Sequence, residues 1–408
     1  MNDGFFTKKE VESKSRPSGK INSCASCGLY KHVKFPKMAP YGEFRKEIMI
    51  VGEAPGEYED LNGKPWQGKA GKLLQLTLES LGIDLFKDCL SINACRCRPI
   101  DTKGGNRIPT NFEIECCRPT TLQIVEQYNP KVILLLGNAA IYSFLGHRWR
   151  KNLEGVYKWR GFTIPDQDFT AWLCPTFHPS FINRLEKNVE IIWKQDLMNA
   201  ISLTSEPLPK NKPPIIKIIT DLKELYDIKS DLISFDYETT GLKPQAKGHR
   251  IICTSVSPDE NSAYVFLMPK SQHERKPFIE LLSNNLVGKM AHNCKFEDTW
   301  SRVRLQQTVR NWQWDSMLAA HLLDNRKGIT GLKFQTYVNF GIVDYDSEIS
   351  PYLQADDKNG NSFNKINKLI SNPEGVHKLL YYCALDSIYE YRLAMKQIKI
   401  IDYNFLPF

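Results

Sequence analysis

Short apolar runs alternate along the chain with stretches that have helical spacing. Four of the runs predict buried strands, at residues 47–51, 89–93, 131–136 and 171–176. Three stretches with apolar residues three or four apart predict helices, at residues 69–81, 110–128 and 138–146. This alternation is typical of an α/β fold with a mainly parallel sheet and helices on both faces.

The pattern is interrupted at Ser205–Pro214, which holds four prolines and predicts an extended linker. Beyond it, apolar runs predict strands at residues 232–235, 251–256 and 263–267. Helical spacing follows near residues 296–304, 315–324, 375–384 and 386–398. A mixed sheet flanked by helices is the simplest arrangement of these elements. We therefore expect a polar, disordered tail at 1–20, a first domain at 21–204, a linker at 205–215 and a second domain at 216–408.

The composition agrees with two globular domains. The 408 residues are 42% apolar and 25% charged, which is enough material for two hydrophobic cores. The net charge of +8 is compatible with a polyanionic partner but does not require one. No apolar run reaches the roughly eighteen residues of a membrane span, and no signal sequence is evident at the start. We expect a cytoplasmic protein with no membrane partner.

The stretch Val51–Leu74 passes from a predicted strand through a turn rich in glycine and proline into a predicted helix. Gly52 and Gly56 allow the backbone to approach a ligand at the carboxyl end of the strand, where open α/β sheets build their sites. Acidic residues and Trp66 follow the turn. On these residues alone, a plain strand-to-helix loop with a solvated acidic face stays open.

Separated strings in the first half occur in the order found in the type-4 uracil-DNA glycosylases, an iron–sulfur family. The strings are Val51–Leu74, Asn93 in SINACRCRP, the Cys-Arg-Pro units at Cys97 and Cys117, and His178-Pro179-Ser180. Residues 20–200 therefore resemble this family, which implies an α/β/α sandwich that acts on uracil-containing DNA.

The same resemblance implies a role for each pocket residue. A glycosylase must stack an extruded base, pair with its edge and stabilise the charge that develops as the base leaves. Trp66 would supply the stacking face, where the family more often has Phe, and Asn93 would read the uracil edge. Glu59 would crowd C5 of the base and so exclude thymine. His178 would donate toward O2, and Glu53 would position or activate the attacking water.

The cysteines are clustered rather than evenly spread. Cys24 and Cys27 form one CxxC pair, and Cys97 and Cys117 follow much later as single residues. Four thiolates can bind zinc or an iron–sulfur cluster, and the spacing alone leaves zinc, a cluster and no metal all open. The resemblance implies a [4Fe–4S] cluster with a structural role on these four cysteines. Their neighbours Cys95 and Cys116 complicate the assignment.

The second half contains carboxylates in a recognisable order. Asp236 and Glu238 stand at i and i+2, so both lie on one face of a predicted strand. His292-Asn293-x-x-Phe296-Glu297 and Tyr382-x-x-x-Asp386 follow. These strings resemble the three motifs of the DEDD exonucleases, in the Tyr-containing subclass of family A DNA polymerases, which implies a ribonuclease H-like fold.

That resemblance implies two divalent ions, Mg²⁺ or Mn²⁺, which activate a water and stabilise the leaving 3′ oxygen. Asp236, Glu238, Glu297 and Asp386 would be the ligands, and Tyr382 would orient the water. Most members have Asp where Glu297 stands, and Asp298 beside it is a substitute candidate. Asp315 is expected to cap a helix.

The combination resembles the front half of phage family A DNA polymerases. The leading hypothesis is a 3′–5′ exonuclease joined to a uracil-DNA glycosylase-like domain, acting on single-stranded DNA or 3′ ends in phage replication or repair, in the host cytoplasm. A separate DNA polymerase subunit is a candidate partner. The alternatives are a non-catalytic DNA-tethering subunit and a nuclease that trims RNA.

Overall fold

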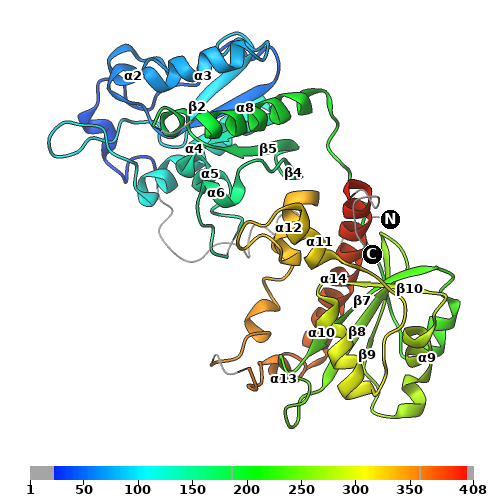
Figure 1. Cartoon of the computed structure of the whole chain (residues 1–408). Helices are drawn as coiled ribbons and strands as arrows, with labels where there is room; N and C mark the ends of the chain where they lie inside the picture. Colours follow the sequence, from blue (N-terminus) through cyan, green and yellow to red (C-terminus); the bar gives the residue numbers. More distant parts are fainter. Residues whose placement is uncertain (1–22, 150, 185–186, 358–359, 402–408) are drawn as a thin grey trace, which may run out of the picture. The chain divides into compact units, whose positions relative to one another are not determined.

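The computed structural model describes residues 23–149, 151–184, 187–357 and 360–401 (Figure 1). The chain divides by its contacts into two compact units. Unit 1 comprises the chain up to His147 together with Cys174–Ser205, and unit 2 comprises Arg148–Leu173 together with the chain from Glu206 onwards. The predicted disordered tail at 1–20 lies outside the described residues.

The first sheet has five strands in the order β2-β1-β3-β5-β4. Its strands are β1 (Ile48–Gly52), β2 (Cys89–Asn93), β3 (Val132–Leu136), β4 (Ile164–Asp166) and β5 (Ala171–Thr176). Strand β1 pairs in parallel with β2 and β3, whereas β4 pairs antiparallel with β5. Strands β1, β2 and β3 are buried along their whole length, as expected of a sheet covered on both faces. The predicted mainly parallel sheet is confirmed.

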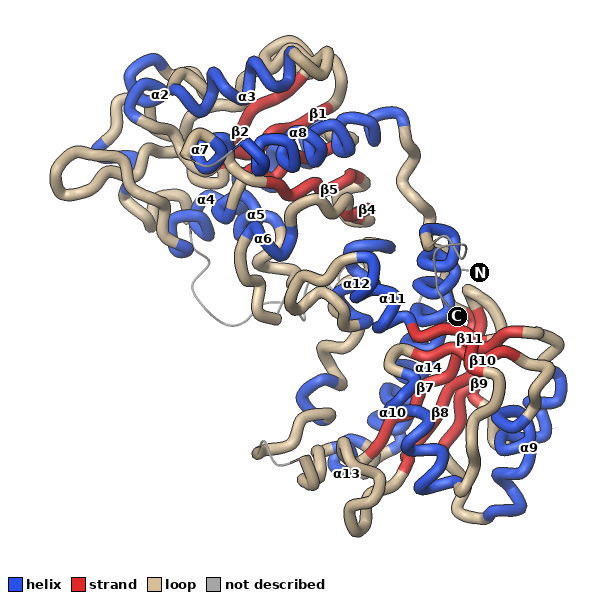
Figure 2. Tube along the Cα trace, in the orientation of Figure 1, coloured by secondary structure: helices blue, strands red, loops and turns tan. Residues whose placement is uncertain are grey.

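Helices cover this sheet in two groups (Figure 2). The helices are α2 (Glu57–Asn62), α3 (Lys69–Glu79), α4 (Asn111–Tyr128), α5 (Asn138–Phe144), α7 (Pro179–Ile182) and α8 (Lys187–Ser202). The short helix α6 (Val156–Trp159) belongs to unit 2 by its contacts. Helix α3 packs on α7, α7 packs on α8, and α8 packs on β3. Helix α4 packs on α5, which contacts β1 and β3. The predicted α/β/α layering is thus confirmed.

The second sheet lies in unit 2 and is mixed, as predicted. Its strands are β6 (Ile215–Ile218), β7 (Leu232–Thr239), β8 (Ile251–Ser257), β9 (Ser262–Leu267), β10 (Gly288–Ala291) and β11 (Trp312–Asp315). Their order is β11-β10-β7-β8-β9-β6. The central pairs β7-β8 and β8-β9 are antiparallel, and the outer pairs are parallel.

The helices of unit 2 pack on both faces of this sheet. They are α9 (Gln272–Ser283), α10 (Cys294–Trp300), α11 (Ser316–Leu323), α12 (Leu332–Phe340), α13 (Ile366–Leu369) and α14 (Pro373–Ile400). Helix α14 covers one face, where Leu379 and Cys383 pack with Cys253 of β8. On the other face, Phe278 of α9 and Trp300 of α10 share a core with β7. No helix in the described residues is both long enough and apolar enough to cross a membrane.

Helix α14 is a single helix, so the prediction of two helices at 375–384 and 386–398 was wrong. Its rotation on the sheet is set by buried serine hydroxyls. Ser234 Oγ donates to the Ser387 carbonyl at 2.6 Å, and Ser255 Oγ donates to the Cys383 carbonyl at 2.7 Å. A buried hydroxyl is costly without a partner, so these bonds restrict α14 to one register. That register determines which side chains of α14 face β7.

Candidate functional site

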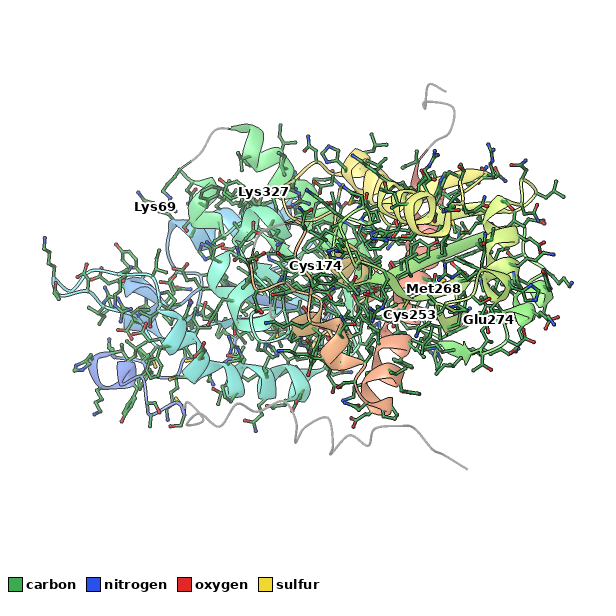
Figure 3. All side chains as sticks on the ribbon, turned by 90° about the horizontal axis from the view of Figure 1, so that it is seen from below. Lys69, Cys174, Cys253, Met268, Glu274 and Lys327 are labelled. Atoms are coloured by element: carbon green, nitrogen blue, oxygen red, sulfur yellow. The ribbon has the colours of Figure 1, made fainter. Side chains whose placement is uncertain are left out.

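Three carboxylates of unit 2 meet between β7 and α14. Asp236 and Glu238 project from one face of β7, and Asp386 comes from α14. Each offers a ligand oxygen, and these oxygens all lie within 4.8 Å of one another. Cys253 of β8, which is labelled in Figure 3, pairs in register with Glu238. The structure therefore brings together residues that are up to 150 positions apart in the sequence.

The charges of these carboxylates repel one another. Desolvation and the neighbouring charge of Asp386 raise the pKa of Asp236 to about 7, although part of its surface is open. Burial, followed by the charge of Asp236, raises the pKa of Glu238 well above its usual range. Buried like charges of this kind become stable when a cation is placed among them. The donor set is all oxygen, so it fits Mg²⁺ or Mn²⁺.

The fourth predicted ligand, Glu297 on α10, is not among the carboxylates whose oxygens lie within 4.8 Å of one another, although the charge of Asp236 acts on it. Its side chain is buried, and its Oε2 has no hydrogen-bond partner among the described residues. Burial, followed by the charge of Asp236, raises the pKa of Glu297. An unpaired buried oxygen near a carboxylate group fits a site that a cation completes. Asp298, the substitute candidate, instead forms an ion pair with Arg302.

The predicted cap at Asp315 is confirmed. Its carboxylate accepts from the backbone N–H groups of Met317 and Leu318 at the start of α11. The same carboxylate also accepts from the N–H groups of Asn293 and Cys294. Asp315 therefore holds the start of α10, the helix that carries Glu297, and not only the start of its own helix.

A second group of polar residues behind the carboxylates was not predicted. His292 Nδ1 lies 2.8 Å from Ser316 Oγ, and Ser316 Oγ donates to Glu390 of α14. Burial raises the pKa of Glu390 to about 8 and lowers the pKa of His292 to about 4. These contacts join the segment before α10 to α14, one turn beyond Asp386. Two signals in the sequence were the presence of His292 in the motif that contains Glu297 and the i, i+4 spacing of Asp386 and Glu390.

Asp386 has further partners that sequence reasoning missed. Lys333 of α12 forms an ion pair with Asp386 Oδ1, and the Tyr345 hydroxyl donates to the same oxygen at 2.8 Å. The predicted Tyr382 is buried, and its ring centroid lies 4.3 Å from Lys333 Nζ. No local pattern marks Lys333, because its partner lies 53 residues away along the chain.

In unit 1, the predicted pocket residues lie at the carboxyl ends of parallel strands. Gly52 ends β1 and is in register with Asn93, which ends β2. A Cβ atom on Gly52 would lie 2.5 Å from Asn93 Oδ1 and 3.1 Å from the Trp66 ring. The absence of a side chain at Gly52 therefore makes the space that the other two groups share. No hydrogen bond between the Asn93 side chain and another described residue is found, so its amide is available to a ligand.

His178 is held in one tautomer. The Ser180 backbone N–H donates to His178 Nδ1 at 3.2 Å, so Nδ1 is the acceptor nitrogen. Burial lowers the pKa of His178 to about 4, which keeps the ring neutral at pH 7. Nε2 therefore carries the hydrogen and can donate. Gly137, with φ of 83°, gives room for this histidine at the end of β3.

Trp66 adopts φ of 60°, an uncommon left-handed conformation for an aromatic residue. Its ring centroid lies 5.7 Å from that of His178, with 31° between the planes. Glu59 holds this loop: its carboxylate accepts from the backbone N–H groups of Gly56 at 3.1 Å and Gln67 at 2.9 Å. The carboxylate of Glu59 thus clamps the two ends of the loop that positions Trp66.

Glu53 follows Gly52 at the end of β1. Burial raises the pKa of its carboxyl, and the charge of Arg184 opposes this shift. The Glu53 backbone carbonyl accepts from Cys95 N at 3.0 Å, which ties the end of β1 to the segment after β2.

Three of the four predicted metal-ligating cysteines lie in one small core, whereas Cys24 is half-buried and outside it. Cys97 and Cys117 lie in a small core with Cys95, and the partly buried Cys27 packs against it. The Lys37 backbone N–H donates to Cys97 Sγ at 3.2 Å. Among the described residues, no three cysteine sulfurs lie within 4.8 Å of one another.

Cys95 and Cys116 differ in their relation to this group. A hydrogen bond from the Cys95 thiol lowers the pKa of Cys117 to about 7, which favours a thiolate at Cys117. Burial raises the pKa of Cys116 to about 11. The thiolate character of Cys117 supports its choice over Cys116 as the ligand.

Both halves of the chain match known families. Residues 39–199 match the Uracil DNA glycosylase superfamily, and residues 215–399 match a 3′-5′ exonuclease family. The Type-4 uracil-DNA glycosylase of Saccharolobus solfataricus is 37% identical over 165 residues, which cover 39% of this chain and 72% of that protein. The corresponding enzyme of Thermotoga maritima is 34% identical over 176 residues, covering 42% of this chain and 83% of that protein.

One relative spans both halves. The DNA polymerase of Bacillus phage SP01 is 24% identical over 408 residues, covering 90% of this chain but 41% of that polymerase. Among solved structures, Brucella melitensis NrnC bound to pGG is 17% identical with a TM-score of 0.34, covering 46% of this chain and 81% of that one. Escherichia coli RNase D is 12% identical with a TM-score of 0.33, covering 46% and 45%.

Proposed function

The N-terminal part of this chain belongs to the type-4 uracil-DNA glycosylase family, and on this premise we propose that the chain is a DNA-processing enzyme with two sites. One is a metal-dependent 3′–5′ exonuclease centre in unit 2, and the other is a uracil pocket in unit 1. The observation that carries the proposal is the convergence of Asp236, Glu238 and Asp386 within 4.8 Å. Similarity to a phage DNA polymerase supports DNA replication or repair as the setting.

In the exonuclease centre, Asp236, Glu238, Asp386 and Glu297 would hold the divalent ions. Such ions supply an activated water and stabilise the leaving 3′ oxygen. The protein fixes the geometry of the donors: the i, i+2 pair on β7 is rigid, and the serine bonds of α14 hold Asp386 opposite it. Tyr382, buried beside the group, would orient the attacking water through its hydroxyl.

The test is degradation of a 5′-labelled single-stranded oligonucleotide in the presence of Mg²⁺ or Mn²⁺. We expect a ladder that shortens from the 3′ end and disappears in EDTA. Asp236→Ala should abolish the ladder, whereas Asp356→Ala should not, because Asp356 is an exposed acid paired with Lys365. Equal degradation by Asp236→Ala and the wild type would refute this assignment. Matched DNA and RNA strands in the same assay determine the sugar preference.

In the uracil pocket, Trp66 would stack on the extruded base and Asn93 would pair with its edge. The neutral His178 would donate from Nε2 toward O2, where negative charge develops as the bond to the sugar breaks. Glu53 would position the water that attacks the sugar. Because Glu59 accepts backbone N–H groups in the structure, its effect on C5 would be exerted through the loop that it clamps.

Uracil release is tested in EDTA, which silences the metal-dependent nuclease. An oligonucleotide with one uracil should acquire an alkali-labile site with the wild-type chain. We expect Asn93→Ala to lose most of this activity, and an identical strand with thymine to stay intact. Release that is equal in Asn93→Ala and the wild type would exclude the proposed pocket.

We further propose a [4Fe–4S] cluster on Cys24, Cys27, Cys97 and Cys117. The Lys37 N–H donated to Cys97 Sγ and the lowered pKa of Cys117 support it. The ligands come from the N-terminal segment, the segment after β2 and helix α4, so a cluster would join elements that are distant in the sequence. Its role would be structural.

A further inference from the structure

Lys333 of α12 reaches into the carboxylate group of unit 2. Its Nζ contacts Asp386 Oδ1, the oxygen that also accepts from the Tyr345 hydroxyl at 2.8 Å. The ammonium lies 4.4 Å from the ring centroid of Tyr345 and 4.3 Å from that of Tyr382. Lys333 thus pairs with a predicted metal ligand, and two aromatic rings flank its ammonium.

The setting of Lys333 differs from that of an ordinary structural ion pair. Its side chain retains 18% of its exposure, whereas the Asp386 side chain retains 8%. The Lys333 side chain is therefore more exposed than the carboxylate that it contacts. The Tyr345 and Tyr382 rings are 6.2 Å apart, and each approaches the same ammonium. A partly open, preoriented cation is well placed to meet an incoming phosphate.

Aromatic packing also fixes helix α12. Phe334 and Tyr337 of α12 pack against Trp149 and Trp159, with ring centroids 5.1 to 6.0 Å apart. These tryptophans belong to Arg148–Leu173, which lies within the glycosylase-family match but groups with unit 2 by its contacts. Lys333 therefore projects from a helix with a well-packed base, which limits the positions that its ammonium can reach.

We propose that Lys333 is a further catalytic residue of the exonuclease centre, whose ammonium binds a non-bridging oxygen of the scissile phosphate. The proposal rests on the exonuclease function proposed above. In the hydrolysis, the water oxygen bonds to phosphorus and the bond from phosphorus to the 3′ oxygen of the preceding nucleotide breaks. The water loses a proton to solvent, and the leaving oxygen gains one from solvent. Lys333 transfers no proton; it stabilises the charge that grows on the phosphate oxygens.

The experiment compares Lys333→Met, Lys333→Arg and a control, Lys378→Met, in the full chain. Lys378 is a lysine of α14 that pairs with Glu348 and Glu374 on the surface. We measure kcat and KM for single-strand degradation at saturating Mn²⁺, and Mn²⁺ stoichiometry and affinity by electron paramagnetic resonance. Removing one preoriented donor from a transition state typically lowers kcat by about 10²- to 10³-fold.

For Lys333→Met we expect that loss in kcat, with KM within about threefold and Mn²⁺ stoichiometry unchanged. Mn²⁺ affinity should be equal or higher, because the competing ammonium is gone. Lys333→Arg should recover part of the loss, and Lys378→Met should match the wild type.

Two results would overturn the proposal. A kcat of Lys333→Met near that of the wild type would make Lys333 only a counter-ion of Asp386. Loss of bound Mn²⁺ in Lys333→Met would make its role structural. If the wild type shows no more degradation than Asp236→Ala, the exonuclease function itself fails and this proposal fails with it.

Discussion

Replacing Gly52 by Ala should impair the uracil pocket and leave the rest of the molecule unchanged. The new Cβ would lie 2.5 Å from Asn93 Oδ1 and 3.1 Å from two Trp66 ring atoms, where ordinary contact begins at 3.4 Å. The Asn93 oxygen must therefore shift by about 0.9 Å, or the strand end must move by a similar amount. Both groups assigned to the base would be displaced, while the buried body of β1 would be unchanged.

The expected loss in the rate of uracil release follows from the hydrogen bonds that the Asn93 amide would lose. A shift of that size breaks one or two hydrogen bonds between the Asn93 amide and the buried edge of the base. Each such bond left unmade costs about 1–3 kcal/mol, so we expect a loss of about 2–4 kcal/mol in transition-state stabilisation. This corresponds to a decrease of about 30- to 900-fold in kcat/KM for uracil release.

The assay is uracil release from a single-stranded oligonucleotide in EDTA, with Gly68→Ala as the matched control. A Cβ on Gly68, in the same loop region, would meet only Glu59 Oε1 at 3.8 Å, so this variant should stay within about threefold of the wild type. Metal-dependent nuclease activity of the same Gly52→Ala preparation reports that the chain is folded. Wild-type uracil release by a folded Gly52→Ala variant would refute the placement of Asn93 and Trp66 around the base.

Further predictions concern charge and metal. Because burial raises the pKa of Glu53, the rate of uracil release should fall as the pH falls through that pKa. This acid limb of the pH–rate profile should be absent in Glu53→Gln. It does not belong to His178, because a pKa of about 4 keeps that ring neutral above about pH 5. Mn²⁺ binding requires ionised Asp236, whose pKa is about 7, so calorimetry should show weaker binding and greater proton release at pH 6 than at pH 8; equal affinity at both would contradict the assignment. Cys97→Ser should lose iron and visible absorbance, and stoichiometric zinc without iron in the wild type would refute the cluster. Glu297→Gln should reduce degradation at saturating metal by at least about tenfold, whereas Glu297→Asp should retain most of it; unchanged rates in Glu297→Gln would remove this residue from the ligand set.

The sequence predicted the parts of the fold that are buried apolar runs. Strands β1, β2, β3 and β5 were predicted almost to the residue, because each is a short run of buried apolar side chains bounded by polar turns. Strand β10 was missed because it contains Lys289, which is fully buried and donates to the backbone carbonyls of Asn284 and Val287. A lysine satisfied by main-chain acceptors cannot be told from a surface lysine in the sequence alone.

The candidate site likewise contains residues that a local sequence pattern predicts and residues that only tertiary packing brings to it. Asp236 and Glu238 were predictable because their i, i+2 spacing is a local geometric fact, and the resemblance supplied Asp386. Lys333 was not predictable, because its contact with Asp386 depends on where α12 packs. The role of Gly52 was predicted only in part. The sequence indicated that a ligand could approach its backbone closely, and the structure shows that Asn93 and Trp66 occupy the space that a side chain at Gly52 would fill.

The segment Arg148–Leu173 limits how the chain can be divided. The proline-rich linker marks a boundary in the sequence, yet by contact this segment groups with the residues after the linker. A fragment that starts at the linker would leave Phe334 and Tyr337 of α12 without Trp149 and Trp159. Removal of one buried tryptophan side chain typically costs about 3–5 kcal/mol, comparable to much of the stability of a small domain. Such a fragment would keep Asp236 and Asp386 but would loosen α12, so its nuclease activity would underestimate that of the full chain.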